Sequence, residues 1–345
     1  MEKIRITSLS RQQLADYIKQ LGQPAFRAGQ IFKWLHQRGV TDFSQMTDIS
    51  KTLAATLADA CEIETLAVAR KQVSKDGTVK YLFCLPDGNC IESVVMRYHY
   101  GNSICVSSEV GCAMGCRFCA STQNGLARRL TAGEIAAQVY GAAADLGEKM
   151  SHIVLMGIGE PLDNYENVLN FLGIISSPEG LNIGMRNISL STCGLVPQIE
   201  RLAGEKLGLT LSVSLHAPNN ELRSSMMPVN DAFPLEVLIP ACRAYQKTTG
   251  RRISFEYAMV KGVNDTQSCA QQLANLLRGM GAHVNLIPIN PVDGSAYTAS
   301  DAANVEQFRS QLEGLGINAT VRRRLGVDIS AACGQLRQEE AGGKQ

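Results

Sequence analysis

A repeated alternation of strand-like and helix-like segments is the feature that most constrains the fold of this chain. From residue 103 onward, apolar runs rich in β-branched residues are separated by amphipathic segments with helical spacing. The runs cover residues 104–107, 153–156, 188–191, 209–215, 253–259 and 284–288. Buried strands separated by helices pair in parallel through right-handed crossovers. We therefore predict an α/β fold, a partial (β/α)6 barrel, with one further strand at residues 319–322.

Two smaller regions precede the predicted barrel. The helical spacing of Leu14, Ile18 and Leu21 predicts a small helical module near the N-terminus. A Pro-Asp-Gly-Asn turn at residues 86–89 separates two strand-like runs and predicts a β-hairpin. The expected parts are a helical module (1–62), a β-hairpin region (63–100), the barrel (101–325) and a C-terminal segment (326–345) with a polar tail.

The charge balance and the cysteine content narrow the classes of function. The 345-residue chain carries 33 basic and 32 acidic residues, a net charge of +1, so any nucleic-acid surface must be a local patch. It has no apolar run of about 18 residues that would predict a membrane span, and no secretory signal pattern. We expect a cytoplasmic monomer without membrane attachment. The chain has 11 cysteines, which is a high number for a cytoplasmic protein. In the reducing cytoplasm, thiols more often serve as metal ligands or redox groups than as structural disulfides.

Cys112, Cys116 and Cys119 form a CxxxCxxC motif just after the first barrel strand. Thr131 and Glu134 are a capping-box pair that predicts the start of the next helix. The three thiols therefore share one strand-to-helix loop at the barrel mouth. Soft thiolates favour iron–sulfur clusters or zinc, and a cubane held by three cysteines leaves one iron open to a further ligand. We predict that these cysteines hold a [4Fe-4S] cluster.

The cysteine motif resembles that of the radical S-adenosylmethionine (SAM) superfamily, in which SAM binds the open iron. Five later segments narrow the resemblance to the RlmN family of RNA adenine C2 methyltransferases. They lie at residues 156–161, 190–192, 214–218, 287–291 and 328–336. The resemblance implies a [4Fe-4S] cluster and SAM as cofactors. Its implied product is 2-methyladenosine, in 23S rRNA at the peptidyl transferase centre and in tRNA next to the anticodon.

The resemblance also implies a set of SAM-binding residues at the strand ends. They are Gly159, Glu160, Ser191, Ser214, Leu215, His216 and Asn290. Short polar groups at the mouth of such a barrel can hydrogen-bond the amino, carboxylate and ribose groups of the cofactor. Ile158 stands between the motif glycines where Met is expected, a small departure from the family pattern.

Cys333 and Cys105 are the candidate mechanistic cysteines. Carbon 2 of adenine is electron-poor and does not attack the SAM methyl group as a nucleophile, so methylation there requires a carbon radical. The resemblance implies that Cys333 takes a methyl group from one SAM. A radical from a second SAM then removes a hydrogen from that S-methyl group, and the methylene radical adds to the base. By the same resemblance, Cys105 attacks the Cys333 sulfur, which forms a disulfide and releases the methylated base.

Glu92 matches the family glutamate that accepts the proton from carbon 2 after the addition. In the strand predicted at residues 90–96, alternation places it on one face with Val94 and Met96, among apolar neighbours. The remaining cysteines have no motif context and are expected to be structural thiols. They are Cys61, Cys84, Cys90, Cys193, Cys242 and Cys269.

Several basic residues are candidate contacts for RNA phosphates. They are Arg128 and Arg129 beside the cysteine loop, Arg322, Arg323 and Arg324 near Cys333, and a helical face with Arg27, Lys33 and Arg38. The partners implied by the resemblance are the 23S rRNA and tRNA substrates and an external electron donor.

Three other functions stay open at this point. A Cfr-like enzyme, which methylates carbon 8 of adenine, would share the cluster, both mechanistic cysteines and the base. A radical SAM enzyme with a non-RNA substrate would have no role for Cys333. The cysteines could instead hold a structural zinc ion, with Cys105 or another cysteine as fourth ligand, in an RNA-binding protein without catalytic activity.

Overall fold

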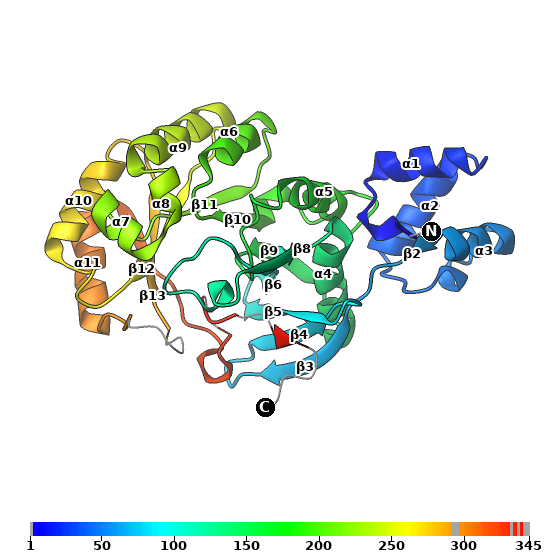
Figure 1. Ribbon diagram of the computed structural model, residues 1–345, viewed down its shortest axis with the longest axis horizontal. Coiled ribbons are helices and arrows are strands. Elements are labelled where there is room, and N and C mark those ends of the chain that lie inside the picture. Colours follow the sequence, from blue (N-terminus) through cyan, green and yellow to red (C-terminus); the bar gives the residue numbers. More distant parts are fainter. Residues whose placement is uncertain (1–2, 291–296, 332–333, 337–338, 341–345) are drawn as a thin grey trace.

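One large mixed sheet is the central feature of the computed structural model, which describes residues 3–290, 297–331, 334–336 and 339–340 (Figure 1). The parallel part of the sheet contains, in order, β6 (Gly101–Cys105), β9 (Met150–Leu155), β10 (Ile188–Thr192), β11 (Thr210–Ser214), β12 (Ser254–Met259), β13 (His283–Pro288) and β14 (Asn318–Val321). The predicted partial barrel with one further strand is therefore confirmed. Among the described strands, β14 ends the sheet and does not pair with β6, so the barrel is open.

The helices of the barrel lie outside the curved sheet (Figure 1). They are α4 (Ala132–Leu146), α5 (Tyr165–Ser176), α6 (Val196–Gly204), α9 (Leu235–Thr249), α10 (Gln267–Leu277) and α11 (Ala302–Gly314), with the short α7 (Asn220–Met226) and α8 (Val229–Ala232) after β11. Helix α4 begins at the predicted capping box of Thr131 and Glu134. Leu190 and Phe255 are fully buried, as expected for strands covered on both faces. Short 3-10 helices lie at Ile6–Ser8, Phe43–Gln45, Ala120–Thr122, Met185–Asn187 and Val327–Ile329.

An antiparallel extension continues the sheet beyond β6. It consists of β3 (Ala67–Val73), β4 (Val79–Cys84) and β5 (Asn89–Tyr98), with the short β15 (Glu339–Glu340) paired to β5. The predicted hairpin corresponds to β4 and β5. Strand β3 was not predicted, because it is largely exposed and its sequence carries little apolar signal.

Cys84 and Cys90 form a disulfide across this hairpin. They are direct partners in the β4–β5 ladder, with their Cα atoms 4.1 Å apart. The expectation that both are structural thiols is therefore wrong. The turn between the strands sets the register that pairs them, and cysteine spacing alone does not reveal that register.

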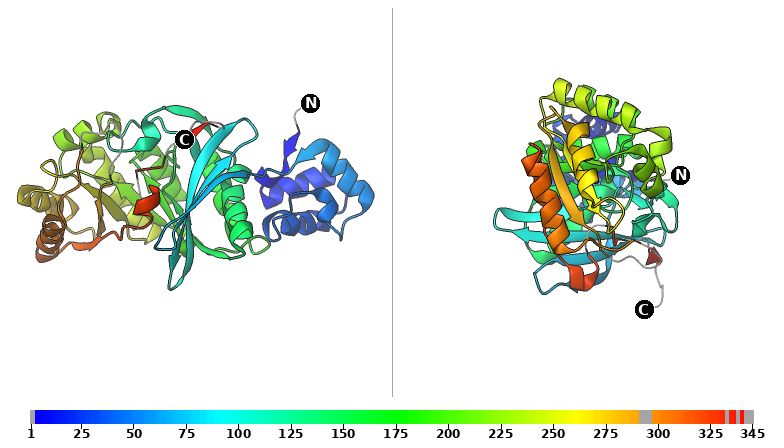
Figure 2. Two further views of the ribbon diagram at one scale, coloured as in Figure 1. Left: turned by 90° about the horizontal axis from the view of Figure 1, so that it is seen from below. Right: turned by 90° about the vertical axis from the view of Figure 1, so that its left-hand side faces the viewer.

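The N-terminal residues form a separate lobe beside the barrel (Figures 1 and 2). The lobe contains β1 (Ile4–Arg5), α1 (Arg11–Gln20), α2 (Phe26–His36), α3 (Lys51–Ala60) and β2 (Cys61–Glu62), with β1 and β2 paired in parallel. Leu14 and Ile18 lie on α1 and are fully buried, which confirms the helical spacing. No helix in the described part of the chain is long and apolar enough to cross a membrane. The predicted division of the chain into four parts, which end at residues 62, 100, 325 and 345, stays a prediction.

Candidate active site

A cavity of ≈ 160 Å³ lies at the C-terminal ends of the parallel strands. Most of the predicted cluster and SAM residues line it, namely Cys112, Cys116, Cys119, Gly159, Glu160, Ser191, Ser214, His216 and Asn290. The fold thus brings residues from distant parts of the chain to one barrel mouth. The side chain of Leu215 differs: it is 1% exposed and does not line the cavity, and its main-chain N–H donates to Glu256 O (3.0 Å).

The cysteine loop is closed at its base by a small antiparallel ladder that was not predicted. In it, β7 (Glu109–Gly111) pairs with β8 (Leu126–Arg129), and Cys112 N donates to Gly125 O (2.9 Å). Further along the loop, Cys119 N donates to Cys116 O (3.1 Å). The loop therefore curls so that all three cysteines line the same cavity.

The three cysteines fit an iron–sulfur cluster by their chemistry. They line the same cavity as most of the predicted SAM residues, and soft thiolates are the ligands that iron–sulfur clusters prefer. Burial raises the pKa of the Cys112 thiol to about 12 and raises that of Cys116 as well. Thiolates at these buried positions therefore need a bound cation to stabilise them.

The loop after β9 depends on glycine at two positions. Gly159 has a φ of +104°, and a Cβ there would lie 2.6 Å from Glu109 Cβ. A Cβ at Gly157 would lie 2.6 Å from the main-chain oxygen of Val106. Neither position has room for a larger residue, so the glycines let the loop pack closely on the segment that follows β6.

Glu160 joins two of the strand-end loops. Its Oε1 accepts from Leu162 N (3.0 Å), and its Oε2 accepts from Cys193 N in the loop after β10 (2.7 Å). The residue is 4% exposed, and burial raises the pKa of its carboxyl group. Cys193 also lines the cavity, which its lack of motif context did not indicate.

Glu109 is a buried carboxyl group that the sequence reasoning missed. It is 0% exposed, and its Oε2 accepts from the main-chain N–H of Glu160 (2.8 Å). Burial, together with the nearby carboxylates of Asp163 and Glu160, raises the pKa of Glu109 to about 8. Burial and the neighbouring carboxylates therefore favour the protonated form of Glu109. In the sequence, only its position between the first strand and Cys112 indicates that Glu109 belongs to the site.

His216 presents a neutral ring to the cavity. Its Nδ1 accepts from the main-chain N–H of Ala258 (2.9 Å), so the ring proton lies on Nε2. Burial, assisted by the charge of Arg223, lowers the pKa of His216 to about 3. The ring also contacts Phe118 edge-on, with centroids 4.9 Å apart. His216 Nε2 is thus a fixed hydrogen-bond donor.

Arg223 is a fully buried arginine that holds the loops after β10 and β11 together. Its Nη2 donates to Cys193 O (2.6 Å), and its Nε donates to Leu215 O (3.2 Å). Its Nη1 donates to Asn230 Oδ1 (3.0 Å). Leu215 therefore shapes the site through its main chain. No sequence motif marks Arg223, because its role depends on contacts between distant segments.

The candidate mechanistic residues Glu92 and Cys105 lie on the paired strands β5 and β6. Glu92 on β5 is 2% exposed, and Cys105 at the end of β6 is 6% exposed. The apolar surroundings predicted for Glu92 are wrong, because Lys80 Nζ lies 2.7 Å from its Oε1. Cys333 lies outside the described residues, but its neighbour Gly334 lines the cavity.

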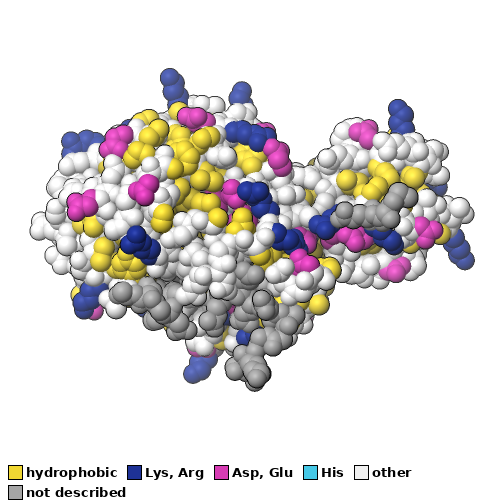
Figure 3. Space-filling view, viewed as in Figure 1, with side chains coloured by type: hydrophobic (Ala, Val, Ile, Leu, Met, Phe, Trp, Pro, Cys, Tyr) yellow, Lys and Arg dark blue, Asp and Glu magenta, His cyan; other side chains and the backbone are white. Residues whose placement is uncertain are grey.

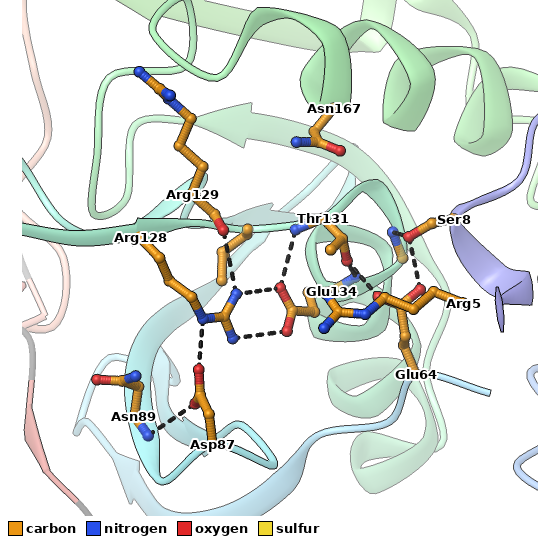
Figure 4. A network of polar contacts seen from close by, with 12 residues as sticks. Arg5, Ser8, Glu64, Asp87, Asn89, Arg128, Arg129, Thr131, Glu134 and Asn167 are labelled. Atoms are coloured by element: carbon orange, nitrogen blue, oxygen red, sulfur yellow. Dashed lines mark hydrogen bonds and ion pairs between the residues drawn. The ribbon is translucent and has the colours of Figure 1, made fainter. Parts of the chain in front are cut away.

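Arg128 pairs with two acidic side chains of the protein (Figure 4), while its side chain is 29% exposed, and its contact with a phosphate stays a prediction. Its Nη1 and Nη2 donate to the two carboxylate oxygens of Glu134 (2.8 Å each), and its Nε donates to Asp87 (2.5 Å). Thr131 at the start of α4 donates to Glu64, which also accepts from Ser8 in the N-terminal lobe. The network joins the hairpin turn, the cysteine loop and the N-terminal lobe.

The remaining basic residues have varied surroundings. Arg129 donates to Asp163 (2.8 Å), and Arg322 lines the cavity. Arg323 and Arg324 line a smaller recess beside Tyr98. Basic and acidic side chains are interspersed on the face seen in Figure 3, in keeping with a net charge of +1. The phosphate contacts of these residues stay predictions.

Comparison with protein families matches two parts of the chain. Residues 4–63 match the family described as "Ribosomal RNA large subunit methyltransferase N-terminal domain". Residues 106–269 match the radical SAM superfamily. The first match covers the N-terminal lobe, and the second includes the cysteine loop and several of the strand-end loops that line the cavity.

Curated proteins and a solved structure match nearly the whole chain. Proteins from Desulforamulus reducens and Lachnoclostridium phytofermentans, each named "Probable dual-specificity RNA methyltransferase RlmN", are both 51% identical to it. These matches cover 97% and 98% of this chain and 96% and 95% of the relatives. The crystal structure of a radical SAM methyltransferase from Sphaerobacter thermophilus is 46% identical, covers 96% of this chain and 99% of its own, and superposes with a TM-score of 0.92. The chain therefore belongs to the RlmN family of dual-specificity RNA methyltransferases, within the radical SAM superfamily.

Proposed function

We propose that this radical SAM methyltransferase forms 2-methyladenosine in 23S rRNA at the peptidyl transferase centre and in tRNA next to the anticodon. It uses two SAM per turnover and an S-methylated Cys333. It works as a monomer in the cytoplasm with an external electron donor.

One observation carries the proposal. The predicted cluster cysteines and every predicted SAM residue except Leu215 line a single cavity, and Gly334, which directly follows Cys333, also lines that cavity. Ala120 N donates to Gly334 O (2.8 Å), so this part of the C-terminal segment is bound to the cysteine loop. The names of the full-length relatives indicate RNA as the substrate class.

The radical SAM family implies a [4Fe-4S] cluster and SAM, and the bound cluster supplies the electron that splits SAM to give a carbon radical. Cys112, Cys116 and Cys119 would hold the cluster. The Nε2 of His216 would donate to SAM, and the hydroxyl groups of Ser191 and Ser214 would bind its polar groups.

The apolar lining of the cavity protects the reaction from water. Met114, Phe118 and Met156 contribute to it, and exclusion of water keeps a reactive radical from side reactions. Cys333 carries the methyl group to the base, Glu92 accepts the proton from carbon 2, and Cys105 attacks the Cys333 sulfur. That last step forms a disulfide, which an external reductant must open before the next turnover.

Nucleoside mass spectrometry tests the proposal. Unmodified 23S rRNA and tRNA are incubated with the iron- and sulfide-loaded protein, SAM and a reductant, and the digested nucleosides are separated by chromatography. We expect 2-methyladenosine from both RNAs, and none from the matched Cys333→Ala protein.

Two results would contradict the proposal. A product that elutes as 8-methyladenosine would assign the chain the carbon-8 chemistry of Cfr-like enzymes. The absence of methylation by a protein with an intact cluster would overturn the proposed RNA sites.

A further inference from the structure

Lys80 is a buried lysine that contacts the candidate base. It lies on β4, is 8% exposed, and its Nζ lies 2.7 Å from Glu92 Oε1. The same Nζ donates to the main-chain oxygen of Ser330 (3.3 Å). Lys80 therefore joins the strand that carries Glu92 to the segment that leads toward Cys333.

Lys80, Glu92 and Cys105 share one face of the sheet formed by β4, β5 and β6. Lys80 is directly opposite Val94 on β5, and Val94 is directly opposite Cys105 on β6. Glu92 lies two residues before Val94, so alternation puts it on that same face. The opposite face packs on α4. The candidate base, the candidate thiol and Lys80 thus point to the same side of the sheet.

The segment bound by Lys80 is also attached to the turn between β3 and β4. Ser74 Oγ donates to Asp328 Oδ1 (2.5 Å), and Gly326 N donates to Asp76 Oδ2 (2.9 Å). The same turn leads directly into β4 and Lys80. Two sets of contacts therefore attach the C-terminal segment to β4 and to the turn before it, and β4 pairs with the strand that carries the base.

A buried ion pair of this kind specifies geometry more than it adds stability. Desolvation of the ammonium and the carboxylate offsets most of their mutual attraction, whereas removal of one partner leaves the other charge buried without compensation. In this site the carboxylate of Glu92 must reach the proton on carbon 2 of adenine, so its position matters. Lys80 contacts the Glu92 carboxylate at Oε1.

We propose that Lys80 is a positioning residue for the proton-transfer step, an inference that rests on the proposed function. Its ammonium holds Glu92 Oε1 and the Ser330 carbonyl together, and so aligns the base with the segment that precedes Cys333. In this step the Glu92 carboxylate takes the proton from carbon 2 and becomes a carboxylic acid. The electron pair of the C–H bond stays in the ring, and Lys80 keeps its proton.

The test compares three full-length variants with the wild type. Lys80→Met removes the charge and keeps the length of the side chain, and Lys80→Arg restores a cation. Lys75→Met makes the same change at an exposed lysine of the neighbouring turn and serves as the control. Each protein is loaded with iron and sulfide and incubated with SAM, a reductant and unmodified tRNA.

Two products are measured, namely released 2-methyladenosine and RNA bound covalently to the protein. When the proton is not removed, the bond between the Cys333 methylene carbon and the base persists. We expect Lys80→Met to accumulate bound RNA and to release product roughly 10–100-fold more slowly than the wild type. Lys80→Arg should restore part of the release rate, and Lys75→Met should match the wild type.

Two further measurements keep the test decisive if the single variant folds poorly. Lys80→Met combined with Glu92→Gln removes both charges, and it should release product no more slowly than Glu92→Gln alone if Lys80 acts through Glu92. Independently of activity, hydrogen exchange of residues 326–331 should be faster in Lys80→Met and unchanged in Lys75→Met.

Wild-type release by Lys80→Met, or an additional loss in the double variant, would overturn the role of Lys80. If the wild-type protein forms neither product, the proposed function fails, and the role of Lys80 fails with it. The two failures are therefore distinguishable.

Discussion

Glu109 and Glu160 are joined by a hydrogen bond in which the main-chain N–H of Glu160 donates to Oε2 of Glu109 (2.8 Å). Glu109 lies on the short strand that leads to the cysteine loop, and Glu160 lies in the loop after β9. This bond therefore connects the strand that leads into the cysteine loop to the loop that carries the predicted SAM residues Gly159 and Glu160. It also places a carboxyl group beside two other acidic residues, Glu160 and Asp163, with consequences for pH.

Glu109→Gln should make the protein more stable at alkaline pH. The folded-state pKa of Glu109 is raised from 4.5 to about 8, so the folded state keeps a proton that the unfolded state loses. Stability should therefore fall as pH rises from about 4.5 to about 8. Glutamine keeps the acceptor oxygen and does not titrate, so thermal unfolding of this variant should depend less on pH. Glu200→Gln at an exposed position is the control. If the thermal stability of Glu109→Gln and of the wild type depended on pH in the same way, the raised pKa of Glu109 would be refuted.

Gly159→Ala should weaken SAM binding and destabilise the fold by roughly 1–3 kcal/mol. The φ of +104° disfavours alanine, and the added Cβ would lie 2.6 Å from Glu109 Cβ. Gly173→Ala is the matched control, since it lies in α5 with no atom within 4 Å of the added Cβ. Calorimetric titration with SAM and thermal unfolding measure both effects. Equal SAM affinity in the two variants would contradict the close packing at Gly159.

Arg128→Met should lower stability by roughly 1–3 kcal/mol, because it leaves the Glu134 carboxylate, which is 5% exposed, without its bidentate partner. Arg97→Met is the comparison, because its ion pair with Glu148 is about 40% exposed on both sides and should contribute less than about 1 kcal/mol. Denaturant unfolding measures the difference. A loss at Arg128 no larger than that at Arg97 would show that the network in Figure 4 does not stabilise the junction.

SAM affinity should not depend on the protonation of His216 between about pH 5 and 7. The folded-state pKa of about 3 lies well below the ordinary 6.5, so the ring stays neutral over this range. The same shift means that His216 reduces stability as pH falls below about 6.5. Calorimetric titrations at pH 5 and 7 with the wild type and His216→Asn test this. A decrease in affinity at pH 5 that His216→Asn abolishes would contradict the neutral ring.

The barrel and most of the lining of the cavity could be predicted from the sequence, because local patterns carry them. Apolar runs mark the parallel strands, and the cysteine motif and short segments such as that at Glu160 mark the strand ends. Leu215 shows the limit of such motifs. It belongs to the motif segment at residues 214–218, but it contributes to the site through its main chain and not through its side chain.

Residues whose roles depend on tertiary contacts could not be predicted. Glu109, Arg223 and Lys80 have no motif, and each acts on a segment far away in the sequence. The Cys84–Cys90 disulfide depends on the register of a hairpin, which the sequence did not specify. For the same reason, the predicted apolar surroundings of Glu92 missed the lysine on the adjacent strand.

The central claim, that the methyl group reaches RNA through Cys333 after loss of one hydrogen, is tested most directly with SAM that carries a trideuterated methyl group. Mass spectrometry of the methyladenosine product counts the deuterium atoms that remain. The proposed route predicts two deuterium atoms in the RNA methyl group and one in 5′-deoxyadenosine, because the radical removes one from the S-methyl group. Three deuterium atoms in the RNA product would mean direct transfer from SAM and would contradict the account.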